Sequence, residues 1–198
     1  IMLIGVGMLL VGNLGAGEFL MRCSFLVTIA GLILFHFGLP SLRLSAFPLL
    51  FFFLAIPLPA LVYNAITFPL QTLAAQYAAW ALDALGISVM RDGNIIYLSD
   101  ITLGVTEACS GIRSLISLVT LATGWAYLTL PYTMERIIFI LVAIPVTIVA
   151  NACRIVLTGI VGQTWGETYA TGTFHLFSGW VIFLVAFLFL AMTHSALQ

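Results

Sequence analysis

The sequence predicts an all-α polytopic membrane protein, in which a transmembrane helix bundle carries an interfacial helix and a small extramembrane β-hairpin or meander. Of the 198 residues, 63% are hydrophobic and 7% are charged, whereas an ordinary soluble domain has about 25% charged residues. The mean hydropathy is +1.22. Several hydrophobic runs approach the roughly 20 residues that a helix needs to cross a bilayer. We therefore expect residues 1–198 to form a single transmembrane domain.

The charged residues and the cysteines exclude several classes of function. Six arginines and no lysine stand against seven acidic residues, so the chain offers no basic surface to a nucleic acid. The three cysteines lack CxxC spacing and no HExxH motif occurs, so neither a disulfide framework nor a zinc site is predicted. We expect no cofactor, no metal and no nucleic-acid partner, and we expect contact with membrane lipids.

The N-terminal part predicts one complete span and one interrupted span. Residues 1–12 are apolar but too few to cross a bilayer, so we expect an N-terminally truncated chain with further helices upstream. Residues 19–39 form a full apolar run that ends at Pro40. Residues 46–63 form another, and the sequence IPLP at 56–59 interrupts it, because proline lacks the backbone donor that a helix needs. We expect a kinked or discontinuous helix there.

Residues 66–85 predict a helix that lies along the membrane interface rather than across the bilayer. Polar residues recur on one side of this helix: Gln71, Thr72, Gln76 and Asp83. Apolar and aromatic residues form the other side: Leu70, Leu73, Tyr77, Trp80 and Leu85. An amphipathic helix with aromatic anchors is typical of an interfacial segment.

After Gly86 the hydrophobic period changes from helical to twofold. Segments 87–91 and 94–98 flank Asp92-Gly93, a dipeptide that favours a tight hairpin turn. From 101 to 106 apolar residues alternate with threonine or glycine. We therefore expect an extramembrane β-hairpin insertion, or a three-stranded meander, over residues 87–106.

Three further spans follow, and counting along them brings three chemically active residues to one face. The spans are 111–130, 137–161 and 174–192. Cys109 precedes the first span, so Arg136 at the start of the second lies on the opposite side. Arg154 comes eighteen residues after Arg136, about 27 Å along a helix, close to the thickness of the bilayer core. Arg154 therefore returns to the Cys109 face, where His175 opens the last span.

Each of these spans carries polar or small residues at helical spacing. The three sets are Ser110, Arg113, Ser114 and Ser117; Thr147, Asn151, Arg154 and Thr158; and His175, Ser178 and Gly179. We expect all three stripes to turn inward around a polar pocket that opens to one membrane face.

This set of residues suits acyl-transfer chemistry. Cys109 is placed as a nucleophile, because the N-terminus of a helix and nearby arginines favour a thiolate. His175 is placed to accept the thiol proton and to give it to a leaving amine. Arg154 is placed to stabilise an oxyanion. Ser110, Asn151 and Arg113 are the expected supporting residues.

Other residues allow alternatives. Glu107 orients His175 or pairs with Arg113, and the sequence favours neither. Cys153 is a rival nucleophile, although consecutive helical residues point about 100° apart, which separates Cys153 from Arg154. We expect His36 to be a packing residue within its apolar run.

A different class of function also fits part of the sequence. In that reading the chain is a non-catalytic membrane transporter or a lipid-headgroup-binding scaffold. The break at Pro57 and Pro59 and the charge of Arg154 would then bind an anionic headgroup, and Cys109 would be incidental. His194 follows the last span on the opposite side, where we expect it to be solvated.

Three strings resemble the exosortase/archaeosortase family of membrane proteins, and most closely the bacterial exosortases. They are EACSGIRSL at 107–115, NACRIVLTG at 151–159 and FHLFSGW at 174–180, in this order on consecutive spans. The preceding stretch also fits, through IPLP, TFPLQ at 67–71 and the hairpin. The resemblance extends over roughly residues 45–192.

The resemblance implies a cysteine endopeptidase or transpeptidase that cleaves the C-terminal sorting signals of exported proteins through a thioester acyl-enzyme. Such a signal, of the PEP-CTERM type, has a short Pro-Glu-Pro type motif, a transmembrane helix and a basic tail. The family's cysteine, arginine and histidine fall on Cys109, Arg154 and His175. The resemblance also places this site on the outer, periplasmic face of the cytoplasmic (inner) membrane.

Overall fold

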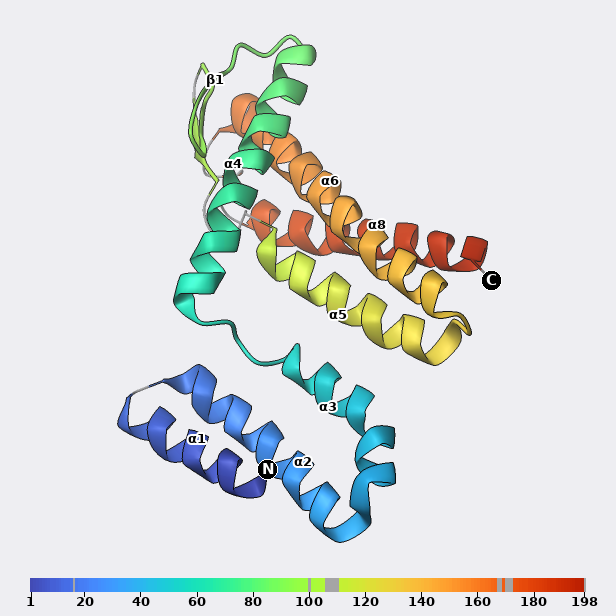
Figure 1. Ribbon diagram of the computed structural model, residues 1–198. Coiled ribbons are helices and arrows are strands. Elements are labelled where there is room, and N and C mark those ends of the chain that lie inside the picture. Colours follow the sequence, from blue (N-terminus) through green and yellow to red (C-terminus); the bar gives the residue numbers. More distant parts are fainter. Residues whose placement is uncertain (16, 100, 106–110, 167–168, 170–172, 198) are drawn as a thin grey trace. The chain divides into compact units, whose positions relative to one another are not determined.

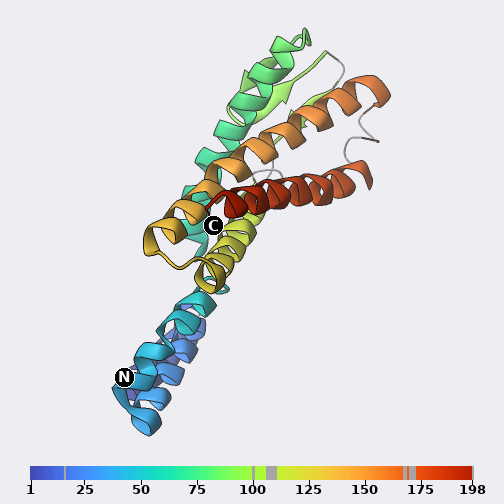
Figure 2. The same cartoon turned by 90° about the vertical axis from the view of Figure 1, so that its right-hand side faces the viewer.

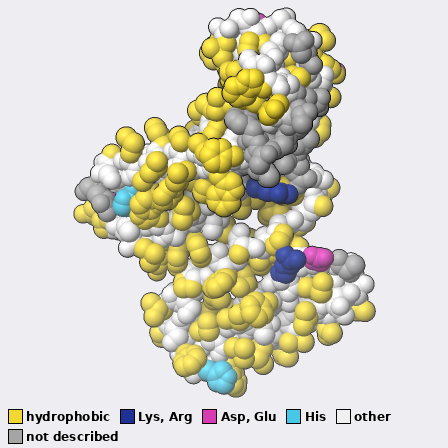
Figure 3. Space-filling model, turned by 180° about the vertical axis from the view of Figure 1, so that it is seen from behind, with side chains coloured by type: hydrophobic (Ala, Val, Ile, Leu, Met, Phe, Trp, Pro, Cys, Tyr) yellow, Lys and Arg dark blue, Asp and Glu magenta, His cyan; other side chains and the backbone are white. Residues whose placement is uncertain are grey.

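The computed structural model confirms an all-α membrane protein with one small antiparallel sheet. It describes residues 1–15, 17–99, 101–105, 111–166, 169 and 173–197, with the backbone alone for 173–176. Within this part, three helical segments are long and apolar enough to cross a membrane: Glu18–Leu44, Thr133–Trp165 and Phe177–Leu197. Hydrophobic side chains are spread over the face shown in Figure 3. The chain divides into two compact units, Ile1–Tyr63 and Asn64–Gln198, which are described separately.

The first unit is built on close packing between helix α1 (Met2–Leu14) and helix α2 (Glu18–Leu44). Glycines let the two backbones approach, since a β-carbon at Gly31 would lie 2.6 Å from the backbone nitrogen of Met2. Inside α2 the backbone turns at Gly38, where φ is +78°. The apolar run predicted to end at Pro40 therefore bends there, and the helix continues to Leu44.

The predicted break at IPLP is confirmed. Helix α3 covers Ala46–Phe53, a non-helical stretch follows, and helix α4 covers Ala60–Ala84. The backbone donors that prolines 57 and 59 remove are those that a continuous helix would need.

Helix α4 contains most of the helix predicted over 66–85 but begins earlier, at Ala60, and its packed side is not the large apolar one. The buried side consists of Gln71, Leu82 and small residues such as Ala74 and Ala78, whereas Trp80 is 72% exposed. Small residues permit close helix contact, and bulky aromatic residues suit a lipid-facing surface. The packed side of α4 therefore combines small residues with one large aliphatic residue, Leu82, while the bulky aromatic residues lie outside it.

Three short strands follow α4 in a meander, as predicted. They are β1 (Met90–Asp92), β2 (Ile95–Tyr97) and β3 (Thr102–Gly104), in the order β1-β2-β3, with all neighbours antiparallel. Asp92 pairs with Ile95, so the two turn residues are Gly93 and Asn94, one position later than predicted. The φ of Gly93 is +59°, which glycine adopts readily.

The meander ends in a fixed position beside its own turn. The backbone nitrogen of Val105 donates to the carbonyl of Asn94 over 2.9 Å, and the side-chain amide of Asn94 donates to the carbonyl of Val105 over 3.0 Å. Ile101, Leu103 and Val105 point inward, as the alternation predicts. Val105 is four residues before Cys109.

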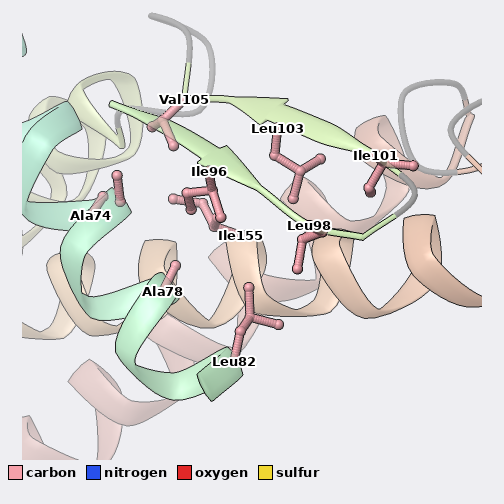
Figure 4. Packing of buried hydrophobic residues seen from close by; sticks show 10 residues of the cluster. Ala74, Ala78, Leu82, Ile96, Leu98, Ile101, Leu103, Val105 and Ile155 are labelled. Carbon is pink, nitrogen blue, oxygen red and sulfur yellow. The ribbon is translucent and has the colours of Figure 1, made fainter. Parts of the chain in front are cut away.

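The sheet packs across α4 and the C-terminal half of helix α6 (Thr133–Trp165). Figure 4 shows the inward side chains of the sheet facing Ala74, Ala78 and Leu82 of α4 and Ile155 of α6. This apolar layer fixes the meander, which precedes Cys109 in the sequence, against α6. Helix α6 is also the helix that carries Arg154.

Helix α6 also packs against helix α5 (Ile112–Thr129) and helix α8 (Thr173–Leu197) (Figures 1 and 2). A second apolar cluster joins the three helices: Leu118, Ala122, Ala126, Leu130, Phe139, Ala143, Ala186 and Leu190. The packed positions of α5 and α8 recur every four residues, which is the spacing of one helix face.

The prediction that His194 is solvated is wrong. His194 is 6% exposed, and its ring stacks on Trp125 with centroids 4.7 Å apart. The Thr129 hydroxyl donates to the carbonyl of Trp125, so Nε2 of His194 donates to Thr129 Oγ1 over 2.6 Å. The reason is that α8 continues to Leu197, which keeps His194 on the packed face, four residues after Leu190.

Candidate functional site

The candidate site is built on one face of α6, where polar residues replace the apolar ones of the neighbouring turns. Thr147, Asn151 and Thr158 are buried and Arg154 is half-buried. The Thr147 hydroxyl donates to the carbonyl of Ala143 over 2.7 Å, and the Thr158 hydroxyl donates to that of Arg154 over 2.9 Å. Both hydroxyls are thus satisfied along their own helix. Asn151 and Arg154 carry the polar groups of this face that lie closest to glycines of the neighbouring helices.

Arg154 borders a small cavity between α5, α6 and α8. The cavity has a volume of about 20 Å³, and its polar lining includes Ser114, Asn151 and Arg154. A space of this size holds about one water molecule. The pocket therefore accommodates one oxygen-sized group beside a guanidinium.

Helix α8 approaches Arg154 at a glycine. A β-carbon at Gly179 would lie 3.0 Å from Nη2 and 3.2 Å from Cζ of Arg154. The Nε atom of the same guanidinium is shielded from solvent. His175 precedes Gly179 by four residues in α8, so the two positions share a helix face. Helix α8 therefore packs on the Arg154 guanidinium at Gly179, one helical turn after the position of His175.

Asn151 separates this cavity from a second and smaller one. The second cavity, of about 10 Å³, lies toward α4 and is lined by residues that include Leu70, Ala74, Gly111 and Asn151. Asn151 is only 6% exposed. Its side chain therefore lies where α4, the start of α5 and the Arg154 pocket meet.

Gly111 is a site residue that sequence reasoning missed. It caps α5 with φ +78°, in the left-handed region, and a β-carbon there would lie 2.9 Å from Cγ of Asn151. The sequence offers one signal for this role. Gly111 stands at the N-cap of the helix that follows the candidate nucleophile, where serine, threonine or aspartate is common.

The predicted catalytic residues are only partly within the described residues. Cys109, Glu107 and Ser110 lie outside them, and His175 is described by its backbone alone. The structure brings together Asn151 and Arg154, and it adds Ser114 from the predicted stripe of α5.

The stripe of α5 does not turn inward as a whole. Arg113 and Ser117 are exposed and line neither polar cavity. The packed face of α5 passes through Ser114 and Leu118. Arg113 and Ser117 each precede one of these residues and therefore point about 100° away around the helix. Among the described residues, therefore, no contact links Arg113 to the Arg154 pocket, where we expected it to play a supporting role.

The rival nucleophile Cys153 points to the other side of α6. It is exposed and lines two open apolar grooves, of about 720 and 610 Å³, but neither polar cavity. His36 is also exposed on α2, with its ring against Phe35 and Phe37, so the expected packing role is wrong. Neither residue is part of the candidate site.

Comparison with known families gives one match over nearly the whole chain. The model of a family described as transmembrane exosortase matches residues 1–192. No curated protein and no solved structure matches the chain. The matched range covers the first compact unit, the second unit as far as Met192, and every residue of the candidate site.

Proposed function

The chain belongs to the transmembrane exosortase family, and from this membership we propose that it is a membrane-embedded cysteine protease or transpeptidase. Its substrates are exported proteins that end in a sorting signal of the PEP-CTERM type: a short motif, a transmembrane helix and a basic tail. The enzyme is a multi-pass protein of the cytoplasmic membrane, with its site on the periplasmic face.

The proposed reaction begins with the Cys109 thiol. His175 accepts the thiol proton while sulfur bonds to the carbonyl carbon of the scissile peptide, and the carbonyl electron pair moves to oxygen. When this intermediate collapses, the C–N bond breaks and the leaving amine takes the proton from His175, which leaves a thioester. Water or an amine acceptor, deprotonated by His175, then attacks the thioester and releases the Cys109 thiolate, which regains the proton.

The observation that carries this proposal is the setting of Arg154. Its guanidinium sits between three helices, with Nε shielded from solvent, beside a space of about 20 Å³. An intramembrane arginine is costly and usually serves a site. A partly buried cation stabilises a developing oxyanion more strongly than one in bulk water, and one such donor typically contributes about 10²- to 10³-fold in rate.

The size of this space favours peptide chemistry over the scaffold alternative. A volume of about 20 Å³ admits one carbonyl oxygen, but it does not admit a phosphate headgroup with its oxygens and ester carbons. A single oxygen next to Arg154 is what an acyl-transfer intermediate requires.

Processing of a tagged protein with a C-terminal sorting signal tests the proposal. We expect Cys109→Ser and His175→Ala to abolish processing and Arg154→Lys to slow it about 100-fold or more, because lysine lacks the planar guanidinium. Cys153→Ser is the matched control, since this cysteine faces the apolar grooves, and it is expected to process normally. Unchanged processing in Cys109→Ser would rule out thiol catalysis.

A further inference from the structure

We infer, on the basis of the proposed function, that Gly111 is a positioning residue: it seats the start of α5 against Asn151, and this contact sets where the chain that follows the proposed nucleophile enters the bundle. Three independent observations support this role. They are the backbone angle of Gly111, the contact that its missing side chain permits, and the place of Asn151 on α6.

The backbone of Gly111 adopts a conformation that other residues reach only with strain. Its φ and ψ are +78° and −1°, in the left-handed region, where a β-carbon crowds the backbone. The carbonyl of Gly111 accepts the hydrogen bond from the backbone nitrogen of Leu115 over 2.8 Å. Gly111 therefore both turns the incoming chain and begins the hydrogen-bonding of α5.

The contact at Gly111 leaves no room for a side chain. The three atoms nearest to an added β-carbon all belong to Asn151: Cγ at 2.9 Å, Cβ at 3.0 Å and Nδ2 at 3.1 Å. Two of these atoms are next to the backbone of α6 rather than at a flexible tip. Because Asn151 is buried between α4 and α5, its side chain has little freedom to withdraw.

Asn151 transmits this contact to the site. Arg154 follows it by three residues on the same face of α6, and both line the same cavity. Cys109 precedes Gly111 by two residues, and two residues reach about 7 Å at most. A displacement of Gly111 from Asn151 therefore moves the attachment point of the nucleophile relative to the guanidinium.

Other glycines of the chain separate the two effects. Gly86 has nearly the same angle, φ +81°, but no atom lies within 4 Å of its added β-carbon. Among the described glycines with positive φ, Gly111 alone also has a neighbour closer than 3.4 Å. Gly86→Ala is thus a matched control that introduces the backbone strain without the contact.

The test uses the full chain in proteoliposomes, in a Cys23→Ser, Cys153→Ser background that leaves Cys109 as the single thiol. The rate of Cys109 alkylation by an impermeant maleimide is measured against pH, alongside processing of the tagged substrate. We expect Gly111→Ala to raise the midpoint of the alkylation profile, because the proposed site uses a cation to favour the Cys109 thiolate and a displaced start of α5 weakens this effect.

Processing is expected to fall by about 100-fold in Gly111→Ala, the loss typical of a misplacement of about 1 Å. Gly86→Ala is expected to leave both the midpoint and the processing rate unchanged. A wild-type alkylation midpoint in Gly111→Ala, or an equal shift in Gly86→Ala, would overturn the inference.

Asn151→Ala supplies the coupling test. It removes the atoms that the new β-carbon meets, so Gly111→Ala should shift the midpoint less in the Asn151→Ala background than alone. Additive shifts would mean that the contact is not the cause. If Gly111→Ala is not recovered from membranes, Asn151→Gln replaces it, since the same amide on a longer chain presses on Gly111. An unchanged midpoint in Asn151→Gln also contradicts the inference.

These measurements separate the two proposals. The alkylation midpoint and its coupling to Asn151 do not require proteolysis. If Cys109→Ser still processes substrate, the proposed protease chemistry fails while the contact between Gly111 and Asn151 is judged on thiol reactivity alone.

Discussion

Replacement of Gly179 by alanine separates the function of the α8 contact from its contribution to stability. The new β-carbon would lie 3.0 Å from Nη2 of Arg154, and ordinary contact begins at 3.4 Å, so the guanidinium must move by about 0.4 Å or more. A misplacement of about 1 Å typically costs about 100-fold in rate. We therefore expect processing to slow about five- to tenfold.

The stability of Gly179→Ala is expected to change in the opposite direction. Gly179 lies inside α8 with φ outside the left-handed region, and alanine favours a helix interior over glycine by about 0.5–1 kcal/mol. The flexible guanidinium can shift without disturbing the helix backbones. The melting temperature in detergent should therefore hold or rise slightly while the rate falls.

The assay compares kcat and KM for processing with thermal unfolding of the same preparation. Gly7→Ala is the matched control, because Gly7 is helical and has no atom within 4 Å of the added β-carbon. A rate for Gly179→Ala within twofold of the unsubstituted protein would refute the placement of Arg154 in the rate-determining step. A fall in both melting temperature and rate would show that the contact is structural.

Two further predictions concern the far end of the bundle and the thiols. His194→Ala removes the hydrogen bond to Thr129 and the stacking on Trp125. It should therefore lower the free energy of unfolding by about 2–4 kcal/mol without changing kcat for processing at low temperature. Loss of kcat in a folded variant would contradict this prediction. An impermeant maleimide should label Cys109 from the periplasmic side, whereas Cys153, in its apolar grooves, should react only with a permeant reagent; labelling of Cys109 from the cytosol alone would reverse the proposed orientation.

The breaks and turns of this fold could be predicted from sequence because they are local backbone effects. The closely spaced Pro57 and Pro59 interrupt the helix, whereas the single Pro40 lies inside α2, and Gly93 permits a tight turn whatever packs beside it. The alternation from Ile101 to Val105 was also readable, because this segment is mixed in polarity. Each of these features depends on a few adjacent residues.

The orientation of the helices was harder to predict, for a physical reason. In a chain that is 63% hydrophobic, polarity does not distinguish the packed side of a helix from the lipid side. Ala74, Ala78 and Leu82 are buried while Trp80 is exposed, so the packed side of α4 excludes its most amphipathic aromatic residue rather than its polar ones. His194 shows the same limit, because a polar residue near a helix end can be buried by packing on a neighbouring aromatic ring.

The candidate site shows this limit most clearly, because its geometry depends on two glycines, which have no side chain. Asn151 and Arg154 were identifiable as polar groups in an apolar helix. Gly111 at the start of α5 and Gly179 on α8 leave room for them: an added β-carbon would lie 2.9 Å from Cγ of Asn151 at the first position and 3.0 Å from Nη2 of Arg154 at the second. The side chains of Asn151 and Arg154 are held in one place only where a neighbouring helix packs closely against them. Glycine permits the closest approach of a helix backbone. Substitution of either glycine should therefore impair the reaction although neither glycine has a functional group to lose.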